Sequence, residues 1–89
     1  MHKVQSVRPL PRTRELELVF ESGEKRVFDV SPYLDKGIFT QLRADEYYNK
    51  VTVFLDSVAW PNGQDFDPDH LYIESRPAAG PVAGVRGRA

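Results

Sequence analysis

The sequence predicts an α+β fold built on a small antiparallel sheet. Apolar and polar residues alternate with the period of a strand over residues 13–20, and a glycine-containing turn and a second alternating segment follow. Ser31-Pro32 and Asp67-Pro68 each place a capping residue before a proline, which is typical of a helix start. The chain has 89 residues, the size of a single domain.

Three strands are predicted in the first third of the chain, over residues 4–8, 13–20 and 25–30. In the second of them, Leu16, Leu18 and Phe20 share one face, and glutamates occupy the other. Residues 21–24 predict a tight hairpin in which Gly23 takes a positive φ. We therefore expect a three-stranded meander.

A short helical segment is predicted next, with Ser31 as its N-cap. Leu34, Ile38 and Leu42 recur at a four-residue spacing and would line one helix face. Gly37 interrupts this pattern, so we expect two short helical pieces.

Two further strands, over residues 51–55 and 58–60, and one final helical turn complete the predicted fold. The strands should close one antiparallel sheet, whose apolar face the helical segment covers. The final turn should begin at the Asp67 cap and place Leu71 and Tyr72 against the core.

We expect a single α+β domain over residues 1–74 and a disordered tail rich in Pro, Ala, Gly and Arg over residues 75–89. Up to Glu74 the chain carries nine Lys or Arg against thirteen Asp or Glu, a net charge of −4. Such an acidic body is unfavourable for a large nucleic-acid face, which needs clustered basic residues.

The sequence contains no cysteine. Small extracellular domains usually depend on disulfides, so we expect a cytoplasmic protein, and cysteine-based zinc or redox chemistry is excluded. The first residues carry charges and prolines, and we expect no secretory signal there. Apolar stretches are far shorter than the roughly 20 residues of a membrane span, so no membrane partner is expected.

One stretch is far more specific than the rest: Trp60 to Tyr72 reads WPNGxDxxPDxLY. It follows the pattern LxLxFxxGExxxFDVSPYL over Leu16 to Leu34 and GxFxxL over Gly37 to Leu42. Together these segments resemble the bacterial domain-of-unknown-function family 2442, and the resemblance spans residues 4–73.

The resemblance implies an α+β fold and no particular activity. Some members of the family carry a helix-turn-helix domain after this one, for which we expect no room after Tyr72. Others sit beside genes of a second small family in an arrangement suggestive of toxin–antitoxin pairs. A regulatory role would therefore require a partner.

The motif supplies five candidate binding residues: Trp60, Asn62, Asp65, Asp69 and His70. The acids Asp65, Asp67 and Asp69 have the spacing of the opening ligands of a calcium loop. However, His70 stands where that loop needs glycine, and Arg76 stands where it needs glutamate. We expect no metal site and no cofactor, and we interpret these acids as caps and turn residues.

Two residues of the motif allow a structural and a functional interpretation. His70 beside Asp69 would serve as a general base, but no nucleophile motif accompanies it, so we expect an exposed residue of a first helical turn. Trp60 is of a type enriched at interface hot spots. We favour a structural role in which its ring packs on Phe20 or Phe39.

Tyr47, Tyr48 and Phe54 are the predicted contact surface. Phe54 lies on the opposite side of its strand from both neighbours, so these aromatic residues cannot all face inward. An exposed aromatic cluster would mark a partner surface. A second helical layer covering the cluster is the alternative.

These observations predict a non-catalytic protein-interaction or regulatory module, with an antitoxin-like subunit as one form of it. Its partner would be another protein or a second copy of the chain. A nucleic-acid-associated accessory protein is one alternative, although the basic residues of the first hairpin are interleaved with glutamates. A small-ligand binder or enzyme that uses Trp60 to Tyr72 is the other.

Overall fold

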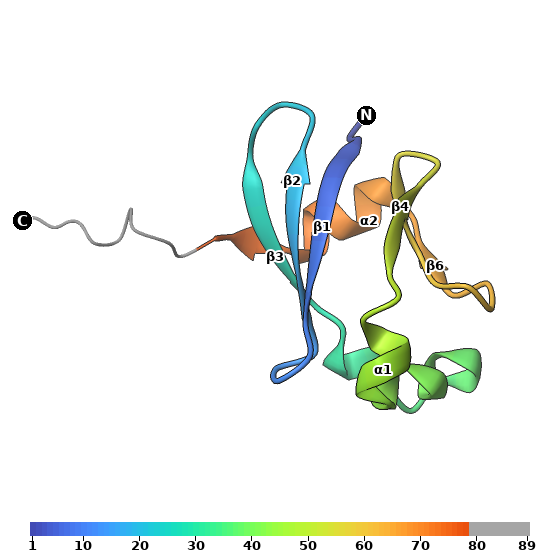
Figure 1. Ribbon diagram of the computed structural model, residues 1–89. Coiled ribbons are helices and arrows are strands. Elements are labelled where there is room, and N and C mark those ends of the chain that lie inside the picture. The colour runs from blue at the N-terminus through green and yellow to red at the C-terminus, as the bar shows by residue number, and fades with distance from the viewer. Residues whose placement is uncertain (79–89) are drawn as a thin grey trace, which may run out of the picture.

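The computed structural model describes residues 1–78, which form two small antiparallel sheets and several short helices (Figure 1). The predicted α+β class is confirmed. In chain order the elements are β1 (Val4–Leu10), β2 (Glu15–Phe20), β3 (Lys25–Asp29), η1 (Ser31–Tyr33), η2 (Gly37–Arg43), α1 (Asp45–Tyr48), β4 (Thr52–Phe54), β5 (Ser57–Ala59), β6 (Asp65–Phe66), α2 (Pro68–Glu74) and β7 (Arg76–Pro77). Within the described residues, no helix is long and apolar enough to cross a membrane.

The first sheet contains the predicted meander and one additional strand, in the order β1-β2-β3-β7. Leu16, Leu18 and Phe20 are buried on one face of β2, as the alternation predicts. The turn between β2 and β3 contains Gly23 with a φ of 93°, and the amide of Gly23 donates to the carbonyl of Phe20 over 2.7 Å. The hairpin prediction is therefore confirmed.

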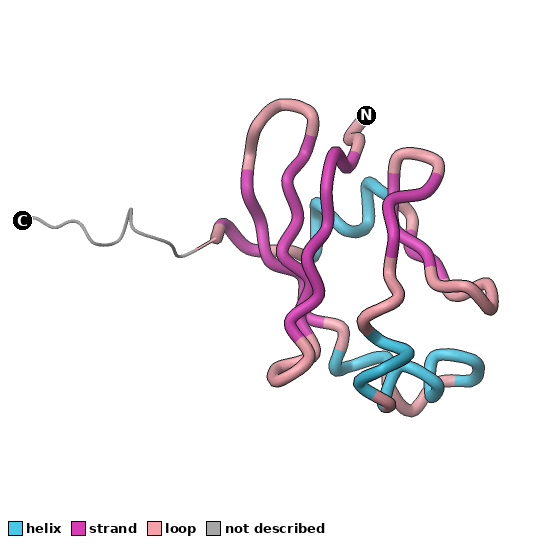
Figure 2. Tube along the Cα trace, viewed as in Figure 1, coloured by secondary structure: helices cyan, strands magenta, loops and turns pink. Residues whose placement is uncertain are grey.

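Strands β4 and β5 do not join this sheet, so the prediction of one sheet is wrong. They pair with each other and with β6 in a separate sheet of order β4-β5-β6 (Figure 2). Strand β5 pairs with β4 along one edge and with β6 along the other, so these three short strands form a ladder of their own. The sheets meet where the amide of Val4 donates to the carbonyl of Asp56 over 2.8 Å.

The helical segment forms two pieces, as predicted, but both are 3₁₀ helices. Residues four apart on a 3₁₀ helix point about 120° apart, since that helix has three residues per turn. Leu42 is therefore buried while Ile38 is exposed. Ser31 is not the N-cap; Val30 holds that position, and the Asp29 carboxylate accepts from the amide and hydroxyl of Ser31 over 2.9 and 2.7 Å.

The helical pieces lie at one end of the sheets rather than over the apolar face of the first sheet (Figure 2). That face is covered by α2, which contacts both β3 and β5, and by the second sheet. Both sheets and α2 contribute side chains to one buried cluster that includes Leu16, Phe28, Tyr48, Val58, Trp60 and Leu71.

Helix α2 begins as predicted, because the Asp67 carboxylate accepts from the amides of Asp69 and His70 over 3.0 and 3.2 Å. After α2 the chain pairs with β3 through β7, and the amide of Ala78 donates to the carbonyl of Lys25 over 3.0 Å. Residues 76–78, which the sequence places in a tail, thus belong to the first sheet. The rest of the predicted tail, residues 79–89, lies outside the described residues.

Candidate functional site

The first half of the motif forms the turn between β5 and β6. The amide of Trp60 donates to the carbonyl of Gln64 over 2.9 Å, and the amide of Gly63 donates to the carbonyl of Trp60 over 3.1 Å. Gly63 has a φ of 100°, a conformation in which glycine carries no steric penalty. The prediction of turn chemistry at Pro61-Asn62-Gly63 is confirmed.

Trp60 is buried, and its indole N–H donates to the backbone carbonyl of Tyr48 over 2.9 Å. Its ring contacts are Tyr48, with ring centres 5.9 Å apart, and Phe66 at 6.2 Å. It does not stack on the predicted Phe20 or Phe39, because the turn directs the indole toward α1. Trp60 thus joins α1 to the second sheet.

Gln64 was not singled out in the sequence, yet it is the fully buried polar residue of the motif. Its Oε1 accepts from the Tyr47 hydroxyl over 2.7 Å, and its Nε2 donates to the carbonyl of Ile38 and to Oε1 of Gln41, each over 2.7 Å. A buried amide must find such partners or lose free energy. No periodicity marks a buried glutamine in a turn, so the pattern offered no signal for it.

The same network holds Asn62, whose backbone amide donates to the Tyr47 hydroxyl over 2.7 Å. Its side-chain Nδ2 donates to Oε1 of Gln41 over 3.0 Å. The Tyr47 hydroxyl therefore accepts from Asn62 and donates to Gln64. These bonds anchor the turn to the helical pieces.

Tyr48 is fully buried, so its assignment to an exposed contact surface is wrong. Its hydroxyl donates to the carbonyl of Glu15 over 2.7 Å, and burial raises its pKa. The guanidinium of Arg14 lies 4.9 Å from its ring centre. Helix α1 turns this side chain inward because Tyr47, its neighbour, occupies the polar network of the β5–β6 turn.

His70 and Asp69 lie on α2 and make separate contacts. The Nε2 atom of His70 is 2.8 Å from the Tyr33 hydroxyl, and its ring stacks on Phe66, so it is half-buried rather than exposed as expected. Burial raises the pKa of Tyr33. Asp69 accepts from the backbone amide of His2 over 3.1 Å and lies 3.0 Å from its imidazole, and these bonds hold the pKa of Asp69 below its usual range.

The three aspartates of the motif do not converge. Asp67 caps α2, Asp69 contacts His2, and Asp65 is exposed on β6. Over residues 1–78 no three His, Asp or Glu side chains gather in a group that would hold a metal ion.

Asp65 instead lines an open pocket of about 400 Å³ on the outer side of the second sheet. The pocket is lined by Lys50, Thr52, Phe54, Ala59, Trp60, Pro61, Gly63 and Asp65. Strand register explains this grouping, since Ala59 pairs with Thr52 on one side and with Asp65 on the other. We call this surface the outer face.

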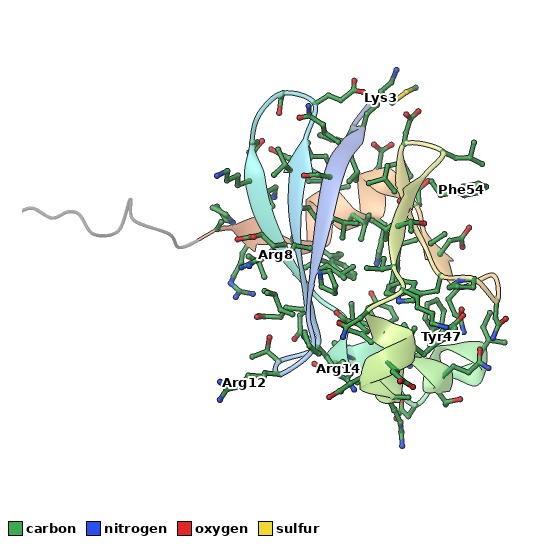
Figure 3. All side chains as sticks on the ribbon, viewed as in Figure 1. Lys3, Arg8, Arg12, Arg14, Tyr47 and Phe54 are labelled. Carbon is green, nitrogen blue, oxygen red and sulfur yellow. The ribbon has the colours of Figure 1, made fainter. Side chains whose placement is uncertain are left out.

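Phe54 carries the largest exposed side chain of the outer face and points away from the body of the protein (Figure 3). Phe54 and Leu55 are 56 and 79% exposed, whereas Val53, 39% exposed, pairs with the buried Val58 on the opposite face of β4. Leu55 and Asp56 form the two-residue turn with φ values of 50° and 69°. A leucine at positive φ is strained, and such strain is often retained at functional sites.

Basic residues of the first sheet are largely paired with acids. Ion pairs join Arg8 to Glu17 at 3.0 Å, Arg14 to Asp45 at 2.7 Å, Arg26 to Glu24 at 2.8 Å and Arg76 to Glu15 at 2.8 Å. The positive charge of these side chains is therefore neutralised locally.

A family described as "Protein of unknown function (DUF2442)" matches residues 4–77. The chain belongs to this family. The membership inferred from the sequence is thus confirmed, while comparisons with curated proteins and with solved structures gave no match.

Proposed function

We propose that this DUF2442 domain is a protein-interaction module that binds its partner on the outer face of the second sheet. The observation that carries the proposal is the open pocket beside the exposed Phe54, next to the exposed Leu55 of the adjacent turn. Contiguous exposed apolar residues on a small domain typically mark a binding surface. The strained turn that displays Leu55 supports the same interpretation.

The contacts of the motif support a non-catalytic role. The polar side-chain atoms of Asn62 and Gln64 are hydrogen-bonded within the domain, to Tyr47, Gln41 and the backbone. Asp65 is the acidic residue of the pocket, which is also lined by Lys50 and by apolar side chains but by no histidine. Histidine is the side chain that serves most often in general acid–base catalysis.

A regulatory function, such as that of an antitoxin bound to its toxin, would be exerted through this same face. We further propose that the binding takes place in the cytoplasm, which the lack of cysteine throughout the sequence supports. Nucleic-acid binding is the weaker alternative, since the arginines of the first sheet are paired with acids.

The test is capture of a partner from lysate of the native cells by the tagged domain, with and without nuclease. We expect one stoichiometric protein that survives nuclease, that is lost with Phe54→Ser and that is retained with Ile73→Ser. Ile73 is the matched control because it is also a large exposed apolar residue, 70% exposed, but lies on α2. Equal capture by both variants would contradict the proposal, and loss upon nuclease treatment would favour the nucleic-acid alternative.

A further inference from the structure

We infer that the outer face binds a second copy of this chain, in a two-fold symmetric dimer in which Lys50 of each copy pairs with Asp65 of the other. This inference rests on the proposed function, because it names the partner of the same surface. The distribution of charge over the face is its starting point.

Lys50 and Asp65 flank the apolar centre of the outer face on opposite sides. Lys50 precedes β4, which is one edge strand of the second sheet, and Asp65 lies on β6, the other edge strand. Both side chains are exposed and both line the pocket. Over residues 1–78 neither of them takes part in an ion pair, so both charges are available to a partner.

This arrangement is complementary to itself. When two identical faces pack about a two-fold axis, a contact from one residue to a second residue of the other copy is always accompanied by the reverse contact. An axis that lies in the interface, perpendicular to the line from Lys50 to Asp65, brings each lysine onto the aspartate of the other copy. The dimer therefore contains two Lys50–Asp65 ion pairs. These favour this orientation over orientations that bring like charges together.

The centre of the face permits such close packing. Ala59, in the middle of the row Thr52–Ala59–Asp65, presents only a methyl group, so the two sheets are free to approach to the spacing of about 10 Å at which stacked sheets pack. Phe54 and Pro61 add apolar area beside it. Residues buried at the centre of the face thus supply affinity, and the charges at its edges supply orientation.

Charge reversal tests the inference with high specificity. Lys50→Asp alone places aspartate opposite Asp65 twice, and Asp65→Lys alone places lysine opposite Lys50 twice. Each variant alone should therefore dimerise at least about tenfold more weakly than the wild type. An equimolar mixture of the two variants forms two Lys–Asp pairs again, so it should recover the wild-type association as a heterodimer.

The measurement is sedimentation equilibrium from about 1 μM to about 1 mM, a range that spans weak and moderate affinities. Lys36→Asp and Asp35→Lys are the controls, since they change the net charge equally at exposed positions of the helical segment. They should dimerise like the wild type. Circular dichroism and thermal unfolding verify that each variant is folded.

A wild type that stays monomeric at about 1 mM would overturn the inference, as would a dimer insensitive to charge reversal or a mixture without recovery. These outcomes are separate from a failure of the proposed function. If the wild type is monomeric while Phe54→Ser still abolishes capture of another protein, the outer face is an interaction surface whose partner is not a second copy. If the dimer forms and responds to charge reversal, the outer face is an interaction surface and its partner is a second copy.

Discussion

The hydroxyl of Tyr47 donates a hydrogen bond of 2.7 Å to the buried Oε1 of Gln64, and this bond joins α1 to the β5–β6 turn. The helical pieces and the second sheet also share aromatic contacts, since Phe66 lies with its ring centre 5.1 Å from that of Tyr33 and 5.2 Å from that of Phe39. Trp60 adds the bond from its indole to the carbonyl of Tyr48. The second sheet, which carries the outer face, is therefore held to α1 in part by hydrogen bonds to buried groups.

Replacement of Gln64 by leucine should destabilise the domain by about 2–3 kcal/mol. The leucine fills a similar volume but removes the acceptor of the Tyr47 O–H and the donor to the carbonyl of Ile38, and an unsatisfied polar group inside a protein costs about 1–3 kcal/mol. Urea unfolding followed by circular dichroism measures the change. Gln5→Leu is the control at an exposed position of β1 and should stay within about 0.5 kcal/mol of the wild type; equal effects for both would contradict the structural role of Gln64.

Of two aspartates in the motif, one should contribute to stability and the other to binding. Asp67→Ala should lower the free energy of unfolding by about 1 kcal/mol, because its carboxylate caps the amides of Asp69 and His70. Asp65→Ala should leave stability unchanged and weaken binding at the outer face, since Asp65 is exposed there. Chemical denaturation and partner capture on the same two variants measure both quantities. A stability loss with Asp65→Ala, or none with Asp67→Ala, would reverse these roles.

The fold was predictable where local chemistry determined it. The alternation around Leu16 and Leu18, the positive φ at Gly23 and the cap at Asp67 are each set by nearest neighbours, and the structure confirms all three. Strand partners are not set locally, because pairing depends on which edges meet in three dimensions. A pattern that predicts β4 and β5 therefore does not say that they form a sheet of their own with β6.

The candidate site was predictable only in part. Phe54 was placed on the exposed side of its strand, and it is exposed. Tyr48, its predicted neighbour in that surface, is buried, because on a single turn of helix the inward direction depends on what α1 packs against. The strain at Leu55 also escaped prediction, since leucine is a poor residue for a two-residue turn and nothing in the sequence announces it.

Trp60→Phe should destabilise the domain by about 2–3 kcal/mol. Phenylalanine keeps an aromatic ring beside Tyr48 and Phe66 but removes the indole N–H, which leaves the buried carbonyl of Tyr48 without a donor. Thermal and urea unfolding measure the loss. Because the sequence contains one tryptophan, its buried emission should also shift to longer wavelength when the wild type unfolds. A loss below about 0.5 kcal/mol would show that the hydrogen bond adds little.

Stability should fall in acid. The Tyr72 hydroxyl, which donates to Glu24 over 2.9 and 3.1 Å, and Arg26, at 2.8 Å, hold the pKa of Glu24 below its ordinary value of 4.5, and His2 holds the pKa of Asp69 below 3.8. A carboxylate whose pKa is lower in the folded state stabilises that state above its unfolded pKa, and the contribution is lost as the pH falls through the folded pKa. The free energy of unfolding should therefore decrease below about pH 4.5.

Glu24→Gln should make this acid dependence shallower, because the amide keeps an acceptor for Tyr72 but no longer titrates. Urea unfolding at a series of pH values between about 3 and 7 provides the measurement. Glu21→Gln is the matched control, since its carboxylate makes no hydrogen bond or ion pair with the described residues, and it should retain the wild-type slope. If both variants keep that slope, Glu24 does not contribute to the acid dependence.

The turn at Leu55-Asp56 should lower the stability of the domain and contribute to binding. Both residues have positive φ, the conformation of a type I′ turn, for which Asn-Gly is strongly preferred. The double change Leu55→Asn with Asp56→Gly should therefore raise the free energy of unfolding by about 1 kcal/mol, by removing strain from an exposed position. It should also weaken partner capture, because it removes an apolar side chain that is 79% exposed beside Phe54.

Asp56→Gly alone separates these two effects, since it relieves one positive φ and leaves Leu55 in place. It should raise stability by less than the double change and leave capture intact. If the double change stabilises the domain without any loss of binding, Leu55 is a strained residue outside the interface. If it destabilises the domain, the carbonyl of residue 56, which accepts from Val4 over 2.8 Å, requires the native turn geometry, and the loss of that hydrogen bond outweighs the relief of strain.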